Sequence, residues 1–323
     1  MTSGPAVPGR RGEPRAGASV CVETPASSAN LGPGFDSIGM ALGVWDRCVA
    51  TVRAEPGLTV TAEGEGAGAV PLDASHLIYR TMVRTWDELG VPAPAGLSLT
   101  CTNAVPHGRG MGSSATAIVT GIVAAQALCG VDEAFGRFDP GFVNDLAARL
   151  EGHPDNASAS VFGGATVSWS DDPAAGTTTV SLAVHPSIVP VVFAPEVQLS
   201  TAKARSVLPA HVRLSDAAAN SGRAALLVHA LATEPRHLVA ATRDWLHQEP
   251  RRPSYAASMA LVDALRAAGH AAVISGAGPS VLALVTADAV ASATTHAPAG
   301  WRVLTPGIPE SGVRVAVVTR ATD

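Results

Sequence analysis

The segment 106–114 constrains this chain more than any other, because three glycines alternate there with other residues between a predicted strand and a predicted helix. Residues 97–101 alternate apolar and polar side chains, which is typical of a strand. Residues 113–128 are apolar on nearly every side, which predicts a helix buried all round. Glycines allow positive φ and a close approach to an anion, and the helix N-terminus adds partial positive charge. Together these features predict a cradle for an oxyanion such as a nucleotide triphosphate.

Two better-known glycine motifs do not describe this loop. No Lys-Ser or Lys-Thr pair closes it, as in a Walker loop, and the glycine spacing differs from the dinucleotide fingerprint. Ser113 and Ser114 instead offer hydroxyls that could contact phosphate oxygens or Mg²⁺. The alternative interpretation is a tight strand-to-helix turn whose serines only cap the helix.

Length and composition argue against several kinds of partner. The 323 residues have room for two domains, and 47% hydrophobic with 15% charged residues is typical of an ordered globular protein. A net charge of -5, without a cluster of Lys and Arg, argues against nucleic acid. No uninterrupted apolar run reaches the length of about 18 residues that a membrane span needs. We therefore expect neither nucleic acid nor a membrane as a partner.

The cysteines and the N-terminal segment both favour a cytoplasmic protein. Cys21, Cys48, Cys101 and Cys129 lie far apart and form no C-x-x-C pair that would suggest zinc or redox chemistry. They are predicted to be reduced core residues. Residues 1–17 lack the apolar region of a signal peptide and are predicted to form a mobile tail.

The order of the predicted elements indicates an α+β fold in two domains. The polar segment 171–179, which carries Gly and Pro, is the predicted boundary, so the domains are expected at 18–172 and 173–323. Apart from additional helices, the second domain reads strand, helix, strand, strand, helix, strand, which is the ferredoxin-like order. Its predicted strands are 189–194, 271–275, 280–286 and 313–319, with a helix at 287–296.

Three motifs, in this order, resemble those of the GHMP kinase superfamily. The first spans 25–36, the second is the loop at 106–114, and the third spans 275–280. The sequence EGHPDN at 151–156, followed by FGG at 162–164, is similar to the homoserine kinases in particular. The resemblance covers almost the whole chain after the tail. It implies the two-domain GHMP kinase fold, with an N-terminal ribosomal-protein-S5-domain-2-like domain and a C-terminal ferredoxin-like domain.

The resemblance also implies an activity. The expected reaction is ATP-dependent phosphorylation of the side-chain hydroxyl of L-homoserine, with Mg²⁺ as the metal, and a homodimer is expected at the family level. Two alternatives stay open: a GHMP kinase acting on a different amino or hydroxy acid, and a catalytically silent paralogue that binds a ligand.

The nucleotide and metal sites follow from the second motif. Mg²⁺ prefers oxygen ligands, and the family places an acidic ligand where this chain has Asp145, so Ser114 and Asp145 are the predicted metal ligands, with Glu151 as the alternative to Asp145. The predicted nucleotide-binding residues are Pro106, His107, Gly108, Arg109, Gly110, Met111, Gly112, Ser113, Ser114, Ala115 and Thr116.

The family pattern also identifies residues for the amino-acid substrate. Asp36 suits its ammonium or hydroxyl group, and Arg205 suits its carboxylate, which a guanidinium binds through two parallel hydrogen bonds. If the segment 153–156 is helical, His153 and Asn156 would share one of its faces. Without a ligand role, Asn30 would be a left-handed turn residue and Asp36 a helix cap. The predicted substrate-binding residues are Asn30, Asp36, His153, Asn156, Arg205 and Arg251.

Two details of this assignment depend on departures from the family pattern. The family usually has an aromatic residue immediately before its second carboxylate-binding arginine, and this chain does not, so Arg252 is the alternative to Arg251. The predicted catalytic residues are Asn156, Ser114 and Asp145. Some GHMP kinases carry an aspartate base where this chain has Asn156, and an amide is not a useful proton acceptor. Asn156 is therefore predicted to orient the hydroxyl, whose proton passes to phosphate or water.

Overall fold

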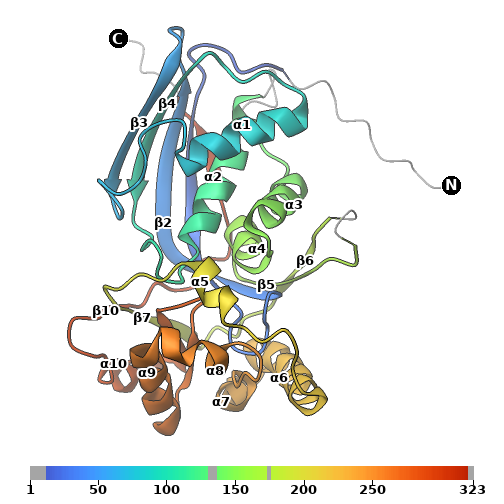
Figure 1. Ribbon diagram of the computed structural model, residues 1–323, viewed down its shortest axis with the longest axis vertical. Helices are drawn as coiled ribbons and strands as arrows, with labels where there is room; N and C mark the ends of the chain where they lie inside the picture. Colours follow the sequence, from blue (N-terminus) through green and yellow to red (C-terminus); the bar gives the residue numbers. More distant parts are fainter. Residues whose placement is uncertain (1–11, 130–136, 173–175, 319–323) are drawn as a thin grey trace, which may run out of the picture.

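Two β-sheets, each covered by helices, lie one above the other along the long axis of the molecule (Figure 1). The computed structural model describes residues 12–129, 137–172 and 176–318. Residues 1–11 of the predicted tail lie outside these ranges. In the described ranges, no helix is both long and apolar enough to cross a membrane.

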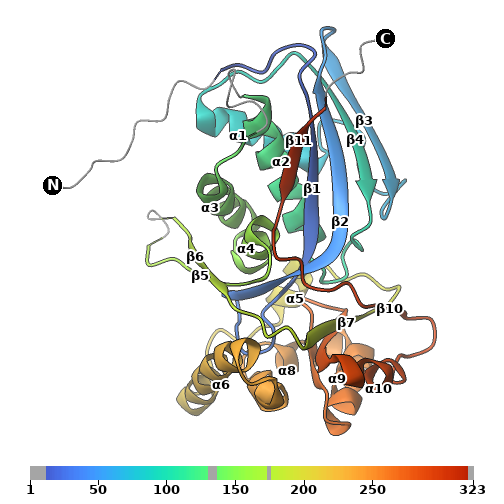
Figure 2. The ribbon, with the colours of Figure 1, turned by 180° about the vertical axis from the view of Figure 1, so that it is seen from behind.

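The first sheet contains seven of the described strands, in the order β11-β1-β2-β4-β3, with β5 paired to β2 and β6 paired to β5. All of these pairs are antiparallel except β3 with β4. The helices α1, α2, α3 and α4 lie over one face of this sheet (Figure 2). The strands are β1 Ser19–Ala29, β2 Ile38–Val52, β3 Gly57–Gly64, β4 Gly96–Asn103, β5 Ala165–Trp169, β6 Thr178–Leu182 and β11 Arg314–Val317, and the helices are α1 Leu77–Leu89, α2 Ser113–Leu128, α3 Pro140–Glu151 and α4 Asp155–Phe162.

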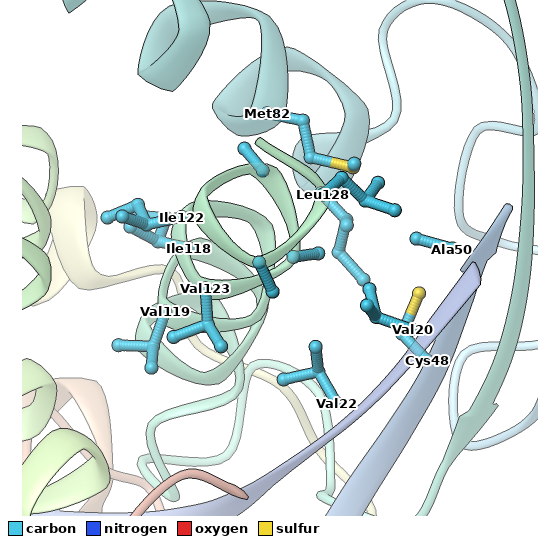
Figure 3. Close-up of a cluster of buried hydrophobic side chains, with 14 of the residues drawn as sticks. Val20, Val22, Cys48, Ala50, Met82, Ile118, Val119, Ile122, Val123 and Leu128 are labelled. Atoms are coloured by element: carbon cyan, nitrogen blue, oxygen red, sulfur yellow. The ribbon is translucent and has the colours of Figure 1, made fainter. Parts of the chain in front are cut away.

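The helix α2 is the centre of the first core, as its composition predicted. It spans Ser113–Leu128, and most of its side chains are buried on every side. Figure 3 shows it between Met82 of α1 and the strand residues Val20, Val22 and Cys48. Because neighbours surround the helix, no polar face is needed, and the amphipathic pattern of a surface helix is absent. This burial holds the first turn of α2 in place at the end of the glycine loop.

The second sheet contains four of the described strands in the order β10-β7-β9-β8. Helices connect β7 to β8 and β9 to β10, so the predicted ferredoxin-like order is present. The strands are β7 Ile188–Ala194, β8 Ala271–Ile274, β9 Val281–Thr286 and β10 Arg302–Leu304, and the helices are α5 Thr201–Ser206, α6 Leu214–Ala232, α7 Leu238–Ala241, α8 Gln248–Arg251, α9 Ala256–Ala267 and α10 Val290–Thr294. Short 3₁₀ turns lie at Pro235–His237, Arg252–Ser254 and Ala287–Ala289.

One predicted strand belongs to the other sheet. The segment 313–319 was expected to be the fourth ferredoxin-like strand, and that prediction is wrong, because β10 takes this place. The chain then returns to the first sheet, where β11 pairs with β1 and Val317 lies opposite Val20. Val313, just before β11, is buried in the first core. An alternating pattern predicts a strand but does not identify its partner, which is a non-local choice.

The predicted boundary between residues 172 and 173 does not separate the two sheets. Both β6 and β11 follow residue 172 in sequence and pair within the first sheet. A shared core also joins the two halves: it combines Leu31, Met40 and Met111 with Leu227 and Val273. The loop after β1 therefore packs against the second half of the chain, and the three motifs meet between the sheets.

Candidate active site

A cavity of about 170 Å³ lies where the two halves of the chain meet. Five parts of the sequence contribute side chains or backbone to its wall, including all three motifs. Besides Arg251, these parts are residues of 29–36, 108–114, 151–156, 199–205 and 276–278. The helix α5, which carries Arg205, lies beside this junction in Figure 1.

The structure brings all six predicted substrate-binding residues to this cavity. They are Asn30, Asp36, His153, Asn156, Arg205 and Arg251. From the predicted nucleotide-binding segment, Gly108, Gly110, Gly112, Ser113 and Ser114 line the same cavity. The remaining residues of that segment do not line it: Pro106, Met111, Ala115 and Thr116 are buried beneath the loop, while His107 lines a second cavity.

The third motif donates hydrogen bonds to backbone carbonyl oxygens of the glycine loop. The Ser275 hydroxyl donates to the carbonyl oxygen of Gly110 at 2.6 Å and lies 2.8 Å from the Ser28 hydroxyl. The backbone amide of Ser280 donates to the carbonyl oxygen of Arg109 at 3.2 Å. Ser275 thus connects the first, second and third motifs. It had no predicted role, because its contacts join segments far apart in the sequence.

The side chain of Arg109 points away from the cradle. Its guanidinium pairs with Glu65 at 3.3 Å and donates to the backbone carbonyl of Glu196 at 3.0 Å. Glu65 also pairs with Arg302 of β10 at 2.8 Å. A ligand role for Arg109 therefore concerns its backbone, while its side chain connects the loop to the second sheet.

A second cavity, of about 240 Å³, opens on the other side of the first turn of α2. Ser113 and Ser114 line both cavities, so the two are adjacent. Its wall is largely apolar, with Val70, Leu77 and Ile78 among the residues that form it. The motif pattern did not reveal this cavity, because much of its wall comes from β2, α1 and the segment between β3 and α1, which lie outside the three motifs.

Asp46 is the acidic residue of this second cavity. Its Oδ1 atom accepts hydrogen bonds from the backbone amides of Ala104 at 2.7 Å and Val105 at 2.9 Å, just before the loop. Burial raises the pKa of Asp46 to about 6, although these two hydrogen bonds oppose the shift. Asp46 therefore supports the chain where β4 leads into the glycine loop.

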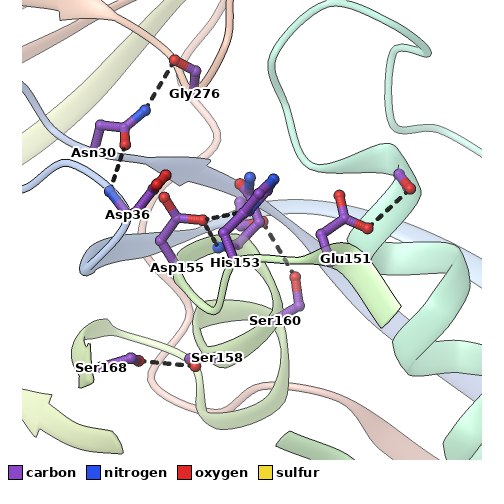
Figure 4. A network of polar contacts seen from close by, with 12 residues as sticks. Asn30, Asp36, Glu151, His153, Asp155, Ser158, Ser160, Ser168 and Gly276 are labelled. Carbon is purple, nitrogen blue, oxygen red and sulfur yellow. Dashed lines mark hydrogen bonds and ion pairs between the residues drawn. The ribbon is translucent and has the colours of Figure 1, made fainter. Parts of the chain in front are cut away.

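The predicted acidic metal ligand, Asp145, does not lie beside Ser114, whereas its alternative, Glu151, does. The Ser114 hydroxyl donates to Glu151 Oε2 at 3.0 Å (Figure 4). Burial raises the pKa of Glu151, while His153 and Ser114 lower it. Asp145 does not line the cavity: its carboxylate accepts from the Thr177 amide at 3.1 Å and pairs with Arg149 at 3.2 Å.

Helix geometry explains this difference. Asp145 and Glu151 both belong to α3 and are six residues apart, which places them about 120° apart around the helix axis. Only one of them can face the loop. Among the described residues, no group of three or more His, Cys, Asp or Glu is arranged to hold a metal by itself.

His153, Asp155 and Asn156 form a hydrogen-bonded group at the start of α4 (Figure 4). Asp155 Oδ1 lies 3.1 Å from His153 Nδ1 and accepts from the Asn156 amide at 2.8 Å. Burial lowers the pKa of His153, but the hydrogen bond and the charge of Asp155 outweigh burial, so the pKa is raised overall. Asn156 Oδ1 accepts from the Ser27 hydroxyl at 3.1 Å, which orients the amide.

The guanidinium-bearing residues Arg205 and Arg251 both line the cavity. Arg205 binds both carboxylate oxygens of Asp36, at 3.1 and 2.5 Å, and this pairing raises the pKa of Arg205. Arg251 lines the cavity although it is only 1% exposed. Arg252 instead pairs with Glu249 and Asp263 on the surface, at 2.7 and 2.8 Å. Of these two candidates, Arg251 is thus the one at the cavity.

The loop after β1 has an unusual backbone. Asn30, Leu31 and Asp36 have positive φ angles of 70°, 45° and 54°. The Asn30 side chain bridges the loop and the third motif: it accepts from the Asp36 amide at 3.0 Å and donates to the Gly276 carbonyl at 3.0 Å. Asn30 is therefore both a left-handed turn residue and part of the cavity wall. The helix-cap interpretation of Asp36 is wrong, because the strand β2 follows it.

Known proteins resemble this chain over most of its length. The chain matches the family models described as GHMP kinases N terminal domain, over residues 76–164, and GHMP kinases C terminal, over residues 224–301. The homoserine kinase of Streptomyces coelicolor is 47% identical over 306 residues, which cover 95% of this chain and 97% of that protein. The homoserine kinase of Streptomyces avermitilis is 49% identical over 285 residues, which cover 88% and 91%.

Solved structures show the same architecture. The crystal structure of homoserine kinase from Cytophaga hutchinsonii has a TM-score of 0.80 at 26% identity and covers 92% of this chain and 97% of its own. Mevalonate diphosphate decarboxylase from Staphylococcus aureus, with a TM-score of 0.65 at 17% identity and coverage of 93% and 98%, shares the fold alone. The predicted two-domain GHMP kinase fold is confirmed, and the chain belongs to the homoserine kinase family of the GHMP kinases.

Proposed function

We propose that this chain transfers the γ-phosphoryl group of ATP to the side-chain hydroxyl of L-homoserine, which gives O-phospho-L-homoserine. One observation carries the proposal: a glycine loop at a helix N-terminus shares a single cavity with Asp36, Arg205 and Arg251. One end of that cavity suits phosphate, and the other suits an amino acid. The relatives named above as homoserine kinases cover nearly the full chain.

The amino-acid end matches a zwitterion. The guanidinium groups of Arg205 and Arg251 suit a carboxylate, and the Asp36 carboxylate suits an ammonium group. Arg205 and Asp36 already bind one another at this end. A zwitterion can replace that pairing with two equivalent ones, because it brings one charge of each sign.

The phosphate end is provided by the loop and the first turn of α2. Backbone amides at a helix N-terminus lack partners within the helix and attract anions. The hydroxyls of Ser113 and Ser114 add polar contacts at the same place. The adjacent cavity suits the nucleotide base, because its wall is largely apolar. Ser113 and Ser114 line both cavities, so a base bound there would lie next to the phosphates.

Ser114 and Glu151 fit Mg²⁺ better than Ser114 and Asp145 do. They present a hydroxyl and a carboxylate oxygen 3.0 Å apart, and hard oxygen ligands are those that Mg²⁺ prefers. Burial raises the pKa of Glu151 and so favours its neutral form. A bound cation would act in the opposite direction and favour the charged carboxylate. When bound, Mg²⁺ would neutralise charge on the phosphate oxygens.

The transfer depends on alignment more than on a strong base. Phosphoryl transfer relies mainly on positioning and charge stabilisation, which the loop amides and the two serines supply. Asn156 is oriented by Ser27 and lines the cavity, so it suits a hydrogen bond to the substrate hydroxyl. The hydroxyl proton then passes to phosphate or water.

Removal of the Asn156 side-chain amide tests the role of this residue. We expect Asn156→Ala to raise KM for homoserine and lower kcat, because the hydroxyl loses its orienting partner, while ATP still binds. Steady-state kinetics with homoserine, together with calorimetric titration of ATP, measures both quantities. Homoserine kinetics identical to wild type would contradict the assignment.

The choice of substrate is tested by a coupled assay of ADP formation with homoserine, threonine, serine and mevalonate. We expect turnover with homoserine. Turnover with another compound would indicate a GHMP kinase of different specificity. No turnover with any of them, in a folded protein that binds ATP, would indicate a silent paralogue. The expected homodimer and the cytoplasmic location stay predictions.

A further inference from the structure

We propose that His247 is a positioning residue that holds the Arg251 guanidinium at the amino-acid end of the cavity. The inference rests on the proposed function, since it assigns Arg251 to a substrate carboxylate. His247 lies four residues before Arg251 and immediately precedes the short helix α8. Its side chain is 0% exposed and does not line the cavity itself.

The hydrogen bonds of His247 define which ring nitrogen carries the proton. His247 Nε2 lies 2.8 Å from the backbone carbonyl oxygen of Gly32, which can only accept. Nε2 must therefore carry the hydrogen, and in a neutral ring Nδ1 is left as an acceptor. Arg251 Nη1 lies 3.1 Å from this Nδ1 atom and donates to it.

These contacts fix the plane of the Arg251 guanidinium. Besides the bond to His247, Arg251 Nε donates to the backbone carbonyl of Ala204 at 2.9 Å. Two different nitrogens are thus bound by two acceptors that belong to different parts of the chain. A planar group held at two points keeps its orientation toward the cavity, which a bidentate contact with a carboxylate requires.

His247 also connects Arg251 to the first motif. Its ring stacks on Phe35, with 5.0 Å between centroids and an interplanar angle of 20°. The guanidinium carbons of Arg205 and Arg251 both lie 5.6 Å from the centre of the Phe35 ring. The Phe35 ring therefore contacts His247 and lies near both guanidinium groups, which connects the loop after β1 with α8.

The arrangement works only while His247 is neutral. Burial lowers the pKa of His247, and the positive charge of Arg251 acts in the same direction. The charge of Asp244, whose Oδ1 lies 3.7 Å from His247 Nε2, the hydrogen bond to Gly32 and the charge of Asp36 oppose the shift. A charged ring would have no lone pair for Arg251 and would place two cations side by side.

Two variants separate this role from simple packing. His247→Phe keeps an aromatic ring against Phe35 but removes the acceptor for Arg251. His247→Asn places an amide oxygen near the position of Nδ1 and keeps that acceptor. We expect His247→Phe to raise KM for homoserine by about 10-fold or more, because a buried donor loses its partner, with little change in KM for ATP. His247→Asn should restore most of the loss.

A histidine remote from the cavity is the matched control. His270, which precedes β8, is 7% exposed and lies 3.2 Å from the Ser292 hydroxyl. His270→Phe should leave KM for homoserine unchanged. Two outcomes would overturn the proposal. One is an unchanged KM for homoserine in His247→Phe. The other is an equal increase of the KM for homoserine and the KM for ATP in both His247→Phe and His247→Asn.

A measurement without turnover keeps the inference separate from the proposed function. Nitrogen NMR of the wild-type protein near pH 7 distinguishes protonated from unprotonated ring nitrogens. We expect His247 to be neutral, with the proton on Nε2. A proton on Nδ1, or a charged ring, would overturn the inference even if homoserine is turned over. Absence of turnover in the wild type would instead contradict the proposed function.

Discussion

The two acidic side chains Asp145 and Glu151 have different partners, which their spacing in the sequence does not reveal. Asp145 and Glu151 are both acidic and lie on one helix, but only Glu151 contacts Ser114. The Asp145 carboxylate is engaged by Arg149 and by the Thr177 amide. The two residues therefore provide a matched pair for testing which one serves the metal.

The first prediction concerns the metal. Glu151→Gln keeps the shape of the side chain but removes its charge, so we expect the activity and the apparent affinity for Mg²⁺ to fall by roughly 10-fold or more. Asp145→Asn should have a much smaller effect. Initial rates at saturating ATP, measured across a range of Mg²⁺ concentrations, give both quantities. A larger loss in Asp145→Asn would reverse the assignment.

The second prediction concerns pH and Asp46. Its folded-state pKa, about 6, lies above the unfolded value of 3.8, so its contribution to stability is present below pH 3.8 and is lost as pH rises through 6. Asp46→Asn removes this titration and keeps an oxygen that can accept from the Ala104 and Val105 amides. The free energy of unfolding of wild type, relative to Asp46→Asn, should fall by on the order of 3 kcal/mol across this range.

Denaturant unfolding of both proteins between pH 4 and 7 measures this difference. Each protein contains the same other titrating groups, so subtracting one curve from the other isolates Asp46. A difference that stays constant with pH would show that the pKa of Asp46 is not raised.

At the scale of elements, the glycine loop and α2 act as one unit. The burial of α2 holds its first turn in place, and the third motif binds the loop carbonyls. Gly110 has φ of 74°, and a Cβ atom there would lie 2.2 Å from the carbonyl oxygen of Ser275. The close approach of loop and third motif therefore requires a glycine at this position.

The third prediction compares two glycines of this loop. Gly110→Ala should cost about 1–2 kcal/mol for the positive φ, and the collision with Ser275 adds to this cost. Gly108 has a φ of 63° and incurs the same backbone cost, but a Cβ atom there would lie 3.3 Å from the Cβ atom of Gln198 and would not collide with backbone. We expect Gly110→Ala to weaken ATP binding and lower the melting temperature more than Gly108→Ala does. Thermal unfolding and ATP titration of both variants measure this, and equal effects would count against the constraint.

At the scale of the whole molecule, the two halves are joined by more than one crossing of the chain. The last strand, β11, returns from the second half and pairs with β1. A shared core combines apolar residues of both halves. The cavity between the sheets therefore has walls that neither half forms alone.

The fourth prediction concerns this return of the chain. A protein ending at Glu310 loses β11 and the buried Val313, whose burial alone is worth about 1.5–3 kcal/mol. We expect its melting temperature to fall by roughly 5 °C or more. A protein ending at Val318 keeps β11 and is the control. Equal melting temperatures, measured by calorimetry, would show that β11 adds no stability.

The sequence alone determined the parts of this protein that depend on local patterns. The helix 113–128 follows from the apolar character of nearly all its residues, and the loop before it from three alternating glycines. The motifs also identified the six substrate-binding candidates, which the fold gathers in one cavity. Periodicity and turn chemistry act over a few residues, so the sequence displays them directly.

Only the tertiary structure decided which of two neighbouring candidates faces the cavity. Glu151 rather than Asp145 meets Ser114, and Arg251 rather than Arg252 lines the cavity. The tertiary structure also decided that the strand after residue 313 joins the first sheet. The physical reason is the same each time: the direction of a side chain and the partner of a strand depend on packing between distant segments, which local sequence does not specify.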